Sequence, residues 1–240
     1  GDYAPTFGVM LPRRYYNASV AVKQVLDEGK LGEIEAVTLD LECCKESSYY
    51  ETWRGRQAIA GGGVLMSQAI HSIDQLVFFF GPPDSVHGRV HTRRAHVDVE
   101  DEAEAMIRFA DGSSAKITAT NNSKDVVWQG ITTIRGSAGV IELDSERVVR
   151  WEVPDLPPPV AEERENVPTE IKPAYYGPGH KKVIVDFIDA VEAKKQTRAG
   201  GIDSLTAVSI ILGIYESSES GESVHLSNYA ESGTLPSKRD

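Results

Sequence analysis

The sequence predicts an α+β fold, in which a large, mostly antiparallel, open β-sheet carries helices on one face. Two observations predict it. Between residues 85 and 153, six strand-like segments follow one another with only turn signals between them, such as Asp111-Gly112. Strands that lack long helical crossovers pair antiparallel. On either side of this run, apolar residues recur at helical spacing, which supplies helices to cover the sheet.

Strands are expected where apolar and polar residues alternate, because successive side chains of a strand point to opposite faces. The expected strands are residues 7–11, 33–44, 85–94, 101–110, 113–121, 126–136, 139–143, 147–153 and 223–226. Helices are expected where apolar residues form one stripe. The expected helices are residues 20–26, 64–80, 180–194 and 203–216.

Two long segments interrupt this pattern. Residues 45–62 are polar and aromatic, and they predict a loop that leads into the helix over 64–80. Residues 154–179 hold seven prolines and predict a long excursion without regular structure. We expect residues 13–228 to form one substrate-binding and oligomerisation domain, followed by a disordered tail over 229–240.

Composition argues against two kinds of partner. The 25 Lys and Arg against 36 Asp and Glu give a net charge of -11, and no window concentrates basic residues, so no nucleic acid is expected. The longest apolar stretch, residues 73–80, is far shorter than the roughly 20 residues that a bilayer requires, so no membrane partner is expected. The two cysteines, Cys43 and Cys44, are adjacent on an expected strand and point apart. This usage predicts a reduced, cytoplasmic protein.

One group of residues points to chemistry. Ser67, His71 and Asp74 are spaced i, i+4 and i+7 on the helix that follows three glycines at 61–63. At about 100° per residue they fall within an arc of roughly 60°, so they are expected to share one polar face. The glycines allow close backbone approach, and the helix N-terminus favours a ligand that carries hydroxyls or negative charge.

Each of these residues also has a structural interpretation. His71 can be a hydrogen-bonded residue at the margin of an amphipathic helix. Asp74 can orient the imidazole or solvate the helix. Arg54 can bind a carboxylate or phosphate, or lie in a solvated loop. His180 can cover the pocket or serve the N-terminus of its own helix.

The run from Gly61 to Asp74, Gly-Gly-Gly-Val-Leu-Met-Ser-Gln-Ala-Ile-His-Ser-Ile-Asp, resembles the glycine-rich helix signature of the Gfo/Idh/MocA oxidoreductases. This family consists of NAD(P)-dependent enzymes that act mainly on sugars and cyclitols. Further segments resemble motifs of the family and occur in the same order along the chain: the segment 7–20, the turn 29–32, Trp53-Arg54-Gly55, Glu100-Asp101, residues 109–112 and 136–142, Gly179-His180 and residues 211–221. The resemblance covers nearly the whole chain and is closest to members acting on nucleotide-linked sugars.

The resemblance implies that His71 lies beside the reacting carbon and works with a lysine of the cofactor domain as proton donor, proton acceptor or substrate orienter. It implies a substrate site that includes Ser67, Asp74, Arg54, Arg14, Tyr15 and His180. Two departures bear on this site. Many members have Asp where this chain has Ser67, which cannot act as a carboxylate base. The segment 12–17 carries one residue more than the usual Arg-Tyr-Asn, so it stays open whether Arg14 points into the site.

No Gly-x-Gly-x-x-Gly occurs in the sequence, so no cofactor-binding residue is expected in this chain and the N-terminal Rossmann domain is expected to be absent. NAD or NADP is the cofactor that the resemblance implies for the full-length enzyme. Residues 1–12 resemble the junction after the last cofactor-domain strand. His87 and His91 lack a third partner, so no metal site is expected.

The chain is therefore expected to be the substrate-binding and catalytic-histidine half of a sugar oxidoreductase, inactive without its cofactor domain. The alternative is a non-catalytic dimerising or sugar-binding module of the same fold. Helices can cover only one face of the sheet, and apolar residues occur in both phases of segment 126–136. We therefore expect an apolar patch on the uncovered face and a homo-dimer or homo-tetramer formed through it.

Overall fold

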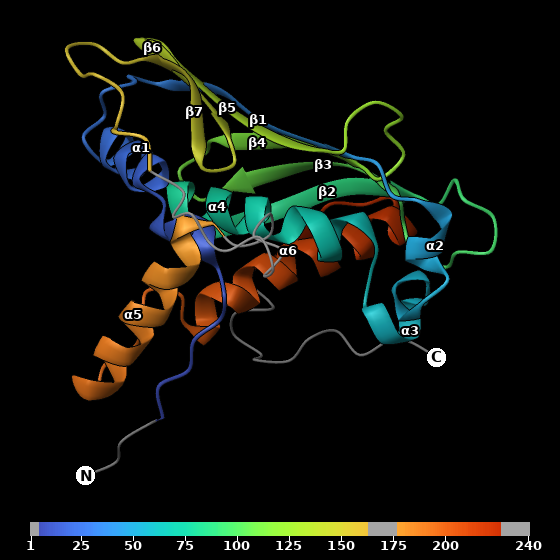
Figure 1. The fold of residues 1–240 in the computed structure, drawn as a ribbon. Helices are drawn as coiled ribbons and strands as arrows, with labels where there is room; N and C mark the ends of the chain where they lie inside the picture. The colour runs from blue at the N-terminus through green and yellow to red at the C-terminus, as the bar shows by residue number, and fades with distance from the viewer. Residues whose placement is uncertain (1–4, 163–176, 227–240) are drawn as a thin grey trace.

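A single eight-stranded sheet organises the chain, and helices cover one of its sides (Figure 1). The computed structural model describes residues 5–162 and 177–226. The strand order is β7-β6-β5-β1-β4-β3-β2-β8. The strands are β1 (Ile34–Cys43), β2 (Pro83–His91), β3 (Glu102–Phe109), β4 (Ser114–Thr120), β5 (Trp128–Gly136), β6 (Gly139–Asp144), β7 (Arg147–Glu152) and β8 (Val224–His225). The predicted α+β class and mostly antiparallel, open sheet are confirmed.

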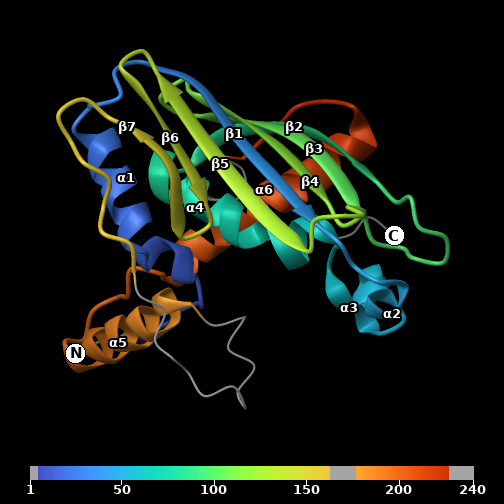
Figure 2. The same ribbon diagram turned by 45° about the horizontal axis from the view of Figure 1, so that its top comes forward.

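The topology differs from a simple meander at one place. The strands β2, β3 and β4 form one antiparallel meander, and β5, β6 and β7 form another. β1 lies between them, parallel to β4 and antiparallel to β5. The chain therefore crosses over β1 between β4 and β5, as Figure 2 shows.

The two faces of the sheet differ sharply in polarity. On the helix-covered face, Leu39 of β1 lies between Ile117 of β4 and Thr132 of β5, and all three are buried. On the other face, Thr38 pairs with Lys116 and Thr133. The open face continues mainly with charged and hydroxyl side chains: Arg89, Glu104, Arg108, Thr118, Asp40, Glu42, Gln129, Arg135, Glu142 and Asp144.

The expectation of an apolar patch on the uncovered face is therefore wrong. Val126 and Val127 precede β5, which begins at Trp128, so they break no alternation within the strand. Within it, Ile131 lies on the open face but pairs with Asp40 and Asp144. The apolar residues of segment 126–136 therefore do not form one apolar surface, because β5 begins two residues after the first of them.

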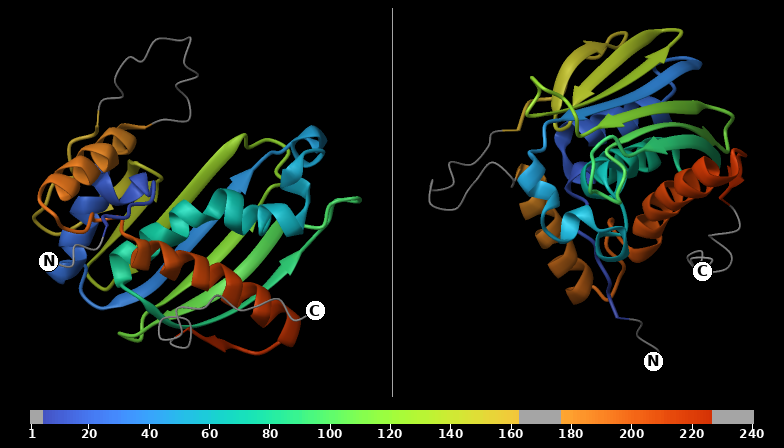
Figure 3. Two further views of the ribbon diagram at one scale, coloured as in Figure 1. Left: turned by 90° about the horizontal axis from the view of Figure 1, so that it is seen from below. Right: turned by 90° about the vertical axis from the view of Figure 1, so that its right-hand side faces the viewer.

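The helical elements are η1 (Pro12–Tyr15), α1 (Asn17–Asp27), α2 (Ser47–Tyr50), η2 (Trp53–Gly55), α3 (Gln57–Ala60), η3 (Leu65–Ala69), α4 (Ile70–Phe80), α5 (Pro178–Glu192) and α6 (Gly201–Ser220). The helices α1, α4 and α6 lie against the covered face of the sheet (Figures 1 and 3). Their apolar side chains, such as Ile73, Leu76 and Ile214, join the core of the sheet. The helix α5 lies away from the sheet and packs on η1. None of the described helices is long and apolar enough to span a membrane.

Two predicted segments have a different structure. Residues 7–11 form no strand, and Val9 makes one backbone hydrogen bond across to Ala199. An isolated extended segment has no neighbouring strand here with which to form a ladder. Residues 45–62 contain the short helices α2, η2 and α3 rather than loop alone. The tail 229–240 and residues 163–176 of the proline-rich segment lie outside the described residues.

Candidate active site

The helix that carries His71 begins with a π-helical segment and is held by a buried carboxylate. In η3 the backbone is wider than an α-helix, a geometry that is often found at functional sites. Glu100, which is 5% exposed, accepts hydrogen bonds from the backbone N–H groups of Gly63 at 2.6 Å and Leu65 at 3.0 Å. Tyr215 of α6 donates to the same carboxylate at 2.8 Å. Glu100 therefore fixes the start of the His71 helix to the sheet end and to α6.

Gly63 is required for this contact. A Cβ atom on Gly63 would lie 1.7 Å from the carbonyl oxygen of Glu100, far inside van der Waals contact. Gly61, by contrast, has a positive φ of 75° and free space around its Cα. The glycine run thus has two different uses, a left-handed turn at Gly61 and close backbone approach at Gly63.

Ser67, His71 and Asp74 do not share one polar face. Ser67 is exposed, His71 is half-buried and Asp74 is fully buried. The π-helical segment changes the angle per residue before His71, so a uniform α-helical wheel misplaces Ser67. The Ser67 hydroxyl donates to the carbonyl oxygen of Gly63 at 2.6 Å.

Asp74 forms an ion pair with Arg14 instead of orienting the imidazole. Arg14 donates to both carboxylate oxygens, with Nε at 3.0 and 2.9 Å and Nη2 at 2.6 Å from Oδ1. The side chains are 5% and 1% exposed. Arg14 therefore joins η1 to α4 from within the protein, which answers the question of where its guanidinium points.

Tyr15 also acts within the fold. Its hydroxyl donates to Asp186 of α5 at 2.8 Å and lies 3.3 Å from the Thr197 hydroxyl. Burial raises the pKa of Tyr15. These contacts attach α5 and the following turn to η1.

His71 is held as a neutral imidazole. Burial is the main reason that its pKa is lowered from 6.5 to about 4, and the electrostatic influence of Arg13 and His180 contributes to the same shift. Its Nδ1 atom is buried and has no hydrogen-bond partner. A neutral imidazole with an unused ring nitrogen can accept or relay a proton.

His180 is close enough to His71 for their charges to interact, and it also has a local role. The backbone N–H of Gly177, which precedes α5, donates to Nδ1 of His180 at 3.2 Å. The ring thus satisfies a donor at the helix N-terminus while remaining near His71. This contact agrees with a role at the helix N-terminus, and the role of covering the pocket stays a prediction.

Arg54 belongs to an aromatic rim beside the helix. Its guanidinium lies over the rings of Trp53 and Tyr49, at 4.7 and 5.2 Å from their centroids. Gln68 of η3 donates to the Tyr49 hydroxyl at 3.3 Å, which joins this rim to the His71 helix.

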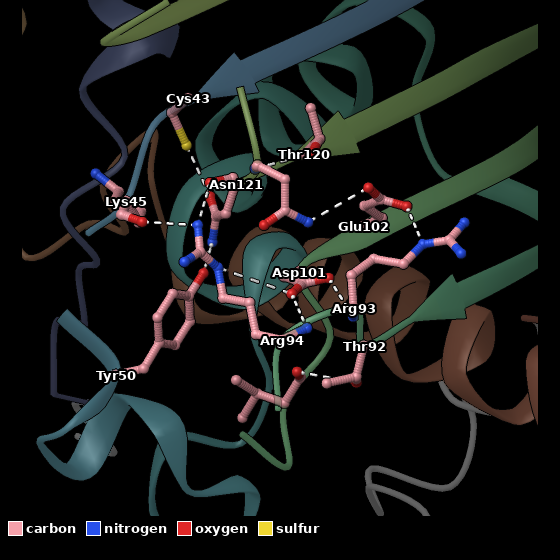
Figure 4. Close-up of polar contacts among 12 residues, drawn as sticks. Cys43, Lys45, Tyr50, Thr92, Arg93, Arg94, Asp101, Glu102, Thr120 and Asn121 are labelled. Atoms are coloured by element: carbon pink, nitrogen blue, oxygen red, sulfur yellow. Dashed lines mark hydrogen bonds and ion pairs between the residues drawn. The ribbon is translucent and has the colours of Figure 1, made fainter. Parts of the chain in front are cut away.

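A polar network surrounds Tyr50, the residue after Tyr49 of the rim (Figure 4). Arg94 lies over the ring of Tyr50 and donates to the carbonyl oxygen of Lys45 at 2.7 Å. Asp101 accepts from the backbone N–H groups of Arg93 and Arg94 at 2.9 and 3.0 Å. Figure 4 also shows Asn121, whose amide donates to the Tyr50 hydroxyl at 2.9 Å. Glu100 and Asp101 thus hold the start of the His71 helix and the segment around Arg94 at adjacent positions.

Sequence reasoning missed Arg13. Its guanidinium is 6% exposed, donates to the Ser72 hydroxyl at 2.7 Å and lies 5.4 Å from the ring centroid of Trp128. The signal was present as an arginine doublet in a short segment flanked by Pro12. The structure brings together Arg13, His71 and His180, whereas Arg14 with Asp74 and Tyr15 form supporting contacts.

His87 and His91 both lie exposed on the open face of β2. Among residues 5–162 and 177–226, no three His, Cys, Asp or Glu side chains are grouped so that they could hold a metal ion. Cys43 and Cys44 are both free thiols.

A sequence profile described as the GFO/IDH/MocA C-terminal domain matches residues 19–142, just over half of the 240 residues. The chain belongs to this family. The matched residues include most of α1, the whole His71 helix and the strands from β1 to most of β6. The family assignment agrees with the resemblance drawn from the glycine-rich helix.

Two curated members of the family are similar in sequence. Levoglucosan dehydrogenase of Pseudarthrobacter phenanthrenivorans is 26% identical over 155 residues, which are 54% of this chain and 40% of that protein. The uncharacterized oxidoreductase YhhX of Escherichia coli is 25% identical over 103 residues, which are 41% of this chain and 27% of that protein. The aligned parts thus amount to less than half of either relative.

Solved structures share the fold. The WlbA dehydrogenase from Bordetella pertussis, in complex with NADH and UDP-GlcNAcA, matches with a TM-score of 0.75 and 23% identity over 91% of this chain and 62% of that chain. Levoglucosan dehydrogenase in complex with NADH and levoglucosan matches with a TM-score of 0.71 and 23% identity over 92% of this chain and 66% of that chain. The chain therefore spans less than two thirds of these proteins.

Proposed function

We propose that residues 13–228 are the substrate-binding and proton-transferring domain of an NAD(P)-dependent oxidoreductase. Its substrate would be a hydroxyl of a sugar, a cyclitol or a nucleotide-linked sugar. The observation that carries the proposal is His71, a half-buried neutral imidazole with an unused Nδ1 atom, on a helix of a family whose relatives bear the names of sugar dehydrogenases.

The chemistry of alcohol oxidation assigns a task to this imidazole. Converting a secondary alcohol to a ketone removes one hydride from carbon and one proton from oxygen. NAD(P)+, when bound, takes the hydride. His71 accepts the hydroxyl proton in this direction and returns it in the reverse direction. A pKa held low mainly by burial means that the imidazole is unprotonated at neutral pH, so a ring nitrogen lone pair is present to take the proton.

The other expected binding residues divide into two groups. Ser67 and Arg54 are on or near the exposed edge of the His71 helix, where they can meet substrate hydroxyls. Arg14, Asp74 and Tyr15 act through the fold, because Arg14 and Asp74 pair with each other inside the protein and Tyr15 donates to Asp186 of α5. His180 closes the site from α5.

We further propose that another domain holds the dinucleotide. The 240 residues contain no Gly-x-Gly-x-x-Gly, so the described residues offer the substrate side of such a site without a cradle for the pyrophosphate. An apolar stripe on α5, formed by Ile184, Phe187, Ile188 and Val191, is exposed at i, i+3, i+4 and i+7. We propose that this stripe packs against the cofactor domain and that residues 1–12 are the junction.

A turnover assay tests the proposal. The chain joined to its cofactor domain should reduce NAD+ or NADP+ in the presence of at least one member of a panel of aldoses, cyclitols and UDP-linked sugars. The 240 residues alone should show no saturable binding of either dinucleotide by calorimetry. Absence of turnover across the panel would favour a non-catalytic sugar-binding module, and tight dinucleotide binding by the 240 residues alone would refute the division between domains.

A further inference from the structure

Arg13 is a buried cation that has no carboxylate partner among residues 5–162 and 177–226. Its guanidinium has five N–H donors, and within these residues one of them donates to a side chain, the Ser72 hydroxyl. No carboxylate oxygen of the described residues lies within 4.0 Å of it. A buried arginine is normally paired with an acid, because desolvating a guanidinium is costly.

The neighbouring Arg14 is a buried arginine that is paired with a carboxylate, that of Asp74. Arg14 donates to both carboxylate oxygens of Asp74, whereas the contact of Arg13 on the same helix is the uncharged Ser72 hydroxyl. Two consecutive arginines of η1 are thus buried in the same region, one neutralised and the other not.

The charges around Arg13 do not supply a partner. Asp144, Glu146 and Asp74 raise its pKa from a distance, but burial is the larger influence and lowers it. Asp144 itself accepts a hydrogen bond from Arg147 at 2.6 Å. A protein of net charge -11 thus buries a cation at Arg13, whose charge also acts on the neutral His71.

We propose that Arg13 binds an oxyanion of the substrate, the carboxylate of a sugar acid in the first instance, next to His71. The unused edges of a guanidinium match two coplanar oxygens. Trp128, which lies over the guanidinium and is 37% exposed, offers an aromatic wall for the C–H face of a sugar ring. This inference rests on the proposed function, and it narrows the substrate to an acidic sugar or a phosphorylated one.

Calorimetry with three probes tests it. The 240-residue chain is titrated with D-glucuronate, D-glucose 6-phosphate and D-glucose. We expect D-glucuronate to bind roughly ten-fold more tightly than D-glucose, the scale of one charge-assisted pair. Arg13→Gln should abolish this preference and Arg13→Lys should keep part of it, whereas Arg135→Gln, at an exposed arginine on the open sheet face, should leave it intact.

Every outcome decides the question. An Arg13-dependent preference for glucose 6-phosphate instead would support the oxyanion and identify it as phosphate. Equal binding of charged and neutral sugars, no binding of any probe at high millimolar concentration, or a preference that survives Arg13→Gln would overturn the proposal. The wild-type comparison holds even if Arg13→Gln does not fold, which circular dichroism reports. These assays measure binding and require no turnover. If binding depends on Arg13 but the protein has no dehydrogenase activity, the proposed function is refuted and the Arg13 proposal stands.

Discussion

Replacing Asp74 by alanine should destabilise the protein strongly, because it leaves the Arg14 guanidinium buried without its carboxylate. The pair is made by three close contacts of 2.6 to 3.0 Å between side chains that are 5% and 1% exposed. Breaking such a buried pair costs about 3–5 kcal/mol, a large part of the stability of an ordinary domain. Urea denaturation at neutral pH, followed by circular dichroism, measures the loss.

Two controls make this test specific. Asp27→Ala removes one partner of the ion pair between Lys23 and Asp27 on the surface of α1, and it should change the stability far less. The double substitution Arg14→Met with Asp74→Leu should recover much of the loss, since no unpaired charge remains. The reasoning is refuted if Asp74→Ala lowers the free energy of unfolding as little as Asp27→Ala does, or if the double variant is no more stable than Asp74→Ala.

Three further predictions follow from the site and the sheet. The pKa of His71 is about 4 in the folded protein, mainly because of burial, and 6.5 in the unfolded chain. Between pH 6.5 and pH 4 the unfolded chain therefore binds a proton at His71 that the folded protein does not bind. The free energy of unfolding should fall by up to about 3 kcal/mol as pH drops through this range. His71→Gln should flatten that part of the stability–pH curve, and an unchanged slope would contradict the assignment. Gly63→Ala should destabilise much more than Gly61→Ala, because only the former meets the Glu100 carbonyl, and thermal melts of the two variants giving equal losses would exclude this reason. Self-association through the open sheet face stays a prediction, and the polarity of that face means that the contacts would be polar. Sedimentation at micromolar concentration should therefore show an oligomer that dissociates as the salt concentration rises. A monomer at low salt would contradict this prediction.

Local patterns predicted most of the sheet because alternation is a local property. The segment 101–110 was predicted as a strand and β3 is Glu102–Phe109, and the segment 113–121 contains β4, Ser114–Thr120. The order of strands was not predictable in this way. Whether β1 pairs with β4 or with another strand depends on contacts between residues far apart in the chain, which alternation does not record.

The candidate site was predicted in part, for a comparable reason. His71 was found from its helix and the family resemblance, both of which are local. The π-helical segment before it was not, so Ser67 and Asp74 were placed on one face. The sequence does not distinguish Arg13 from Arg14, because only the fold shows that Arg14 is the arginine that pairs with Asp74.

The central claim is that His71 transfers the proton of the reacting hydroxyl. The most direct measurement compares kcat for wild type, His71→Ala and His87→Ala in the protein joined to its cofactor domain, with the best substrate of the panel. Loss of general acid–base catalysis predicts a kcat roughly 100-fold or more lower for His71→Ala. His87 is exposed on the open sheet face, so His87→Ala should turn over like wild type. A folded His71→Ala protein with wild-type kcat would contradict the account.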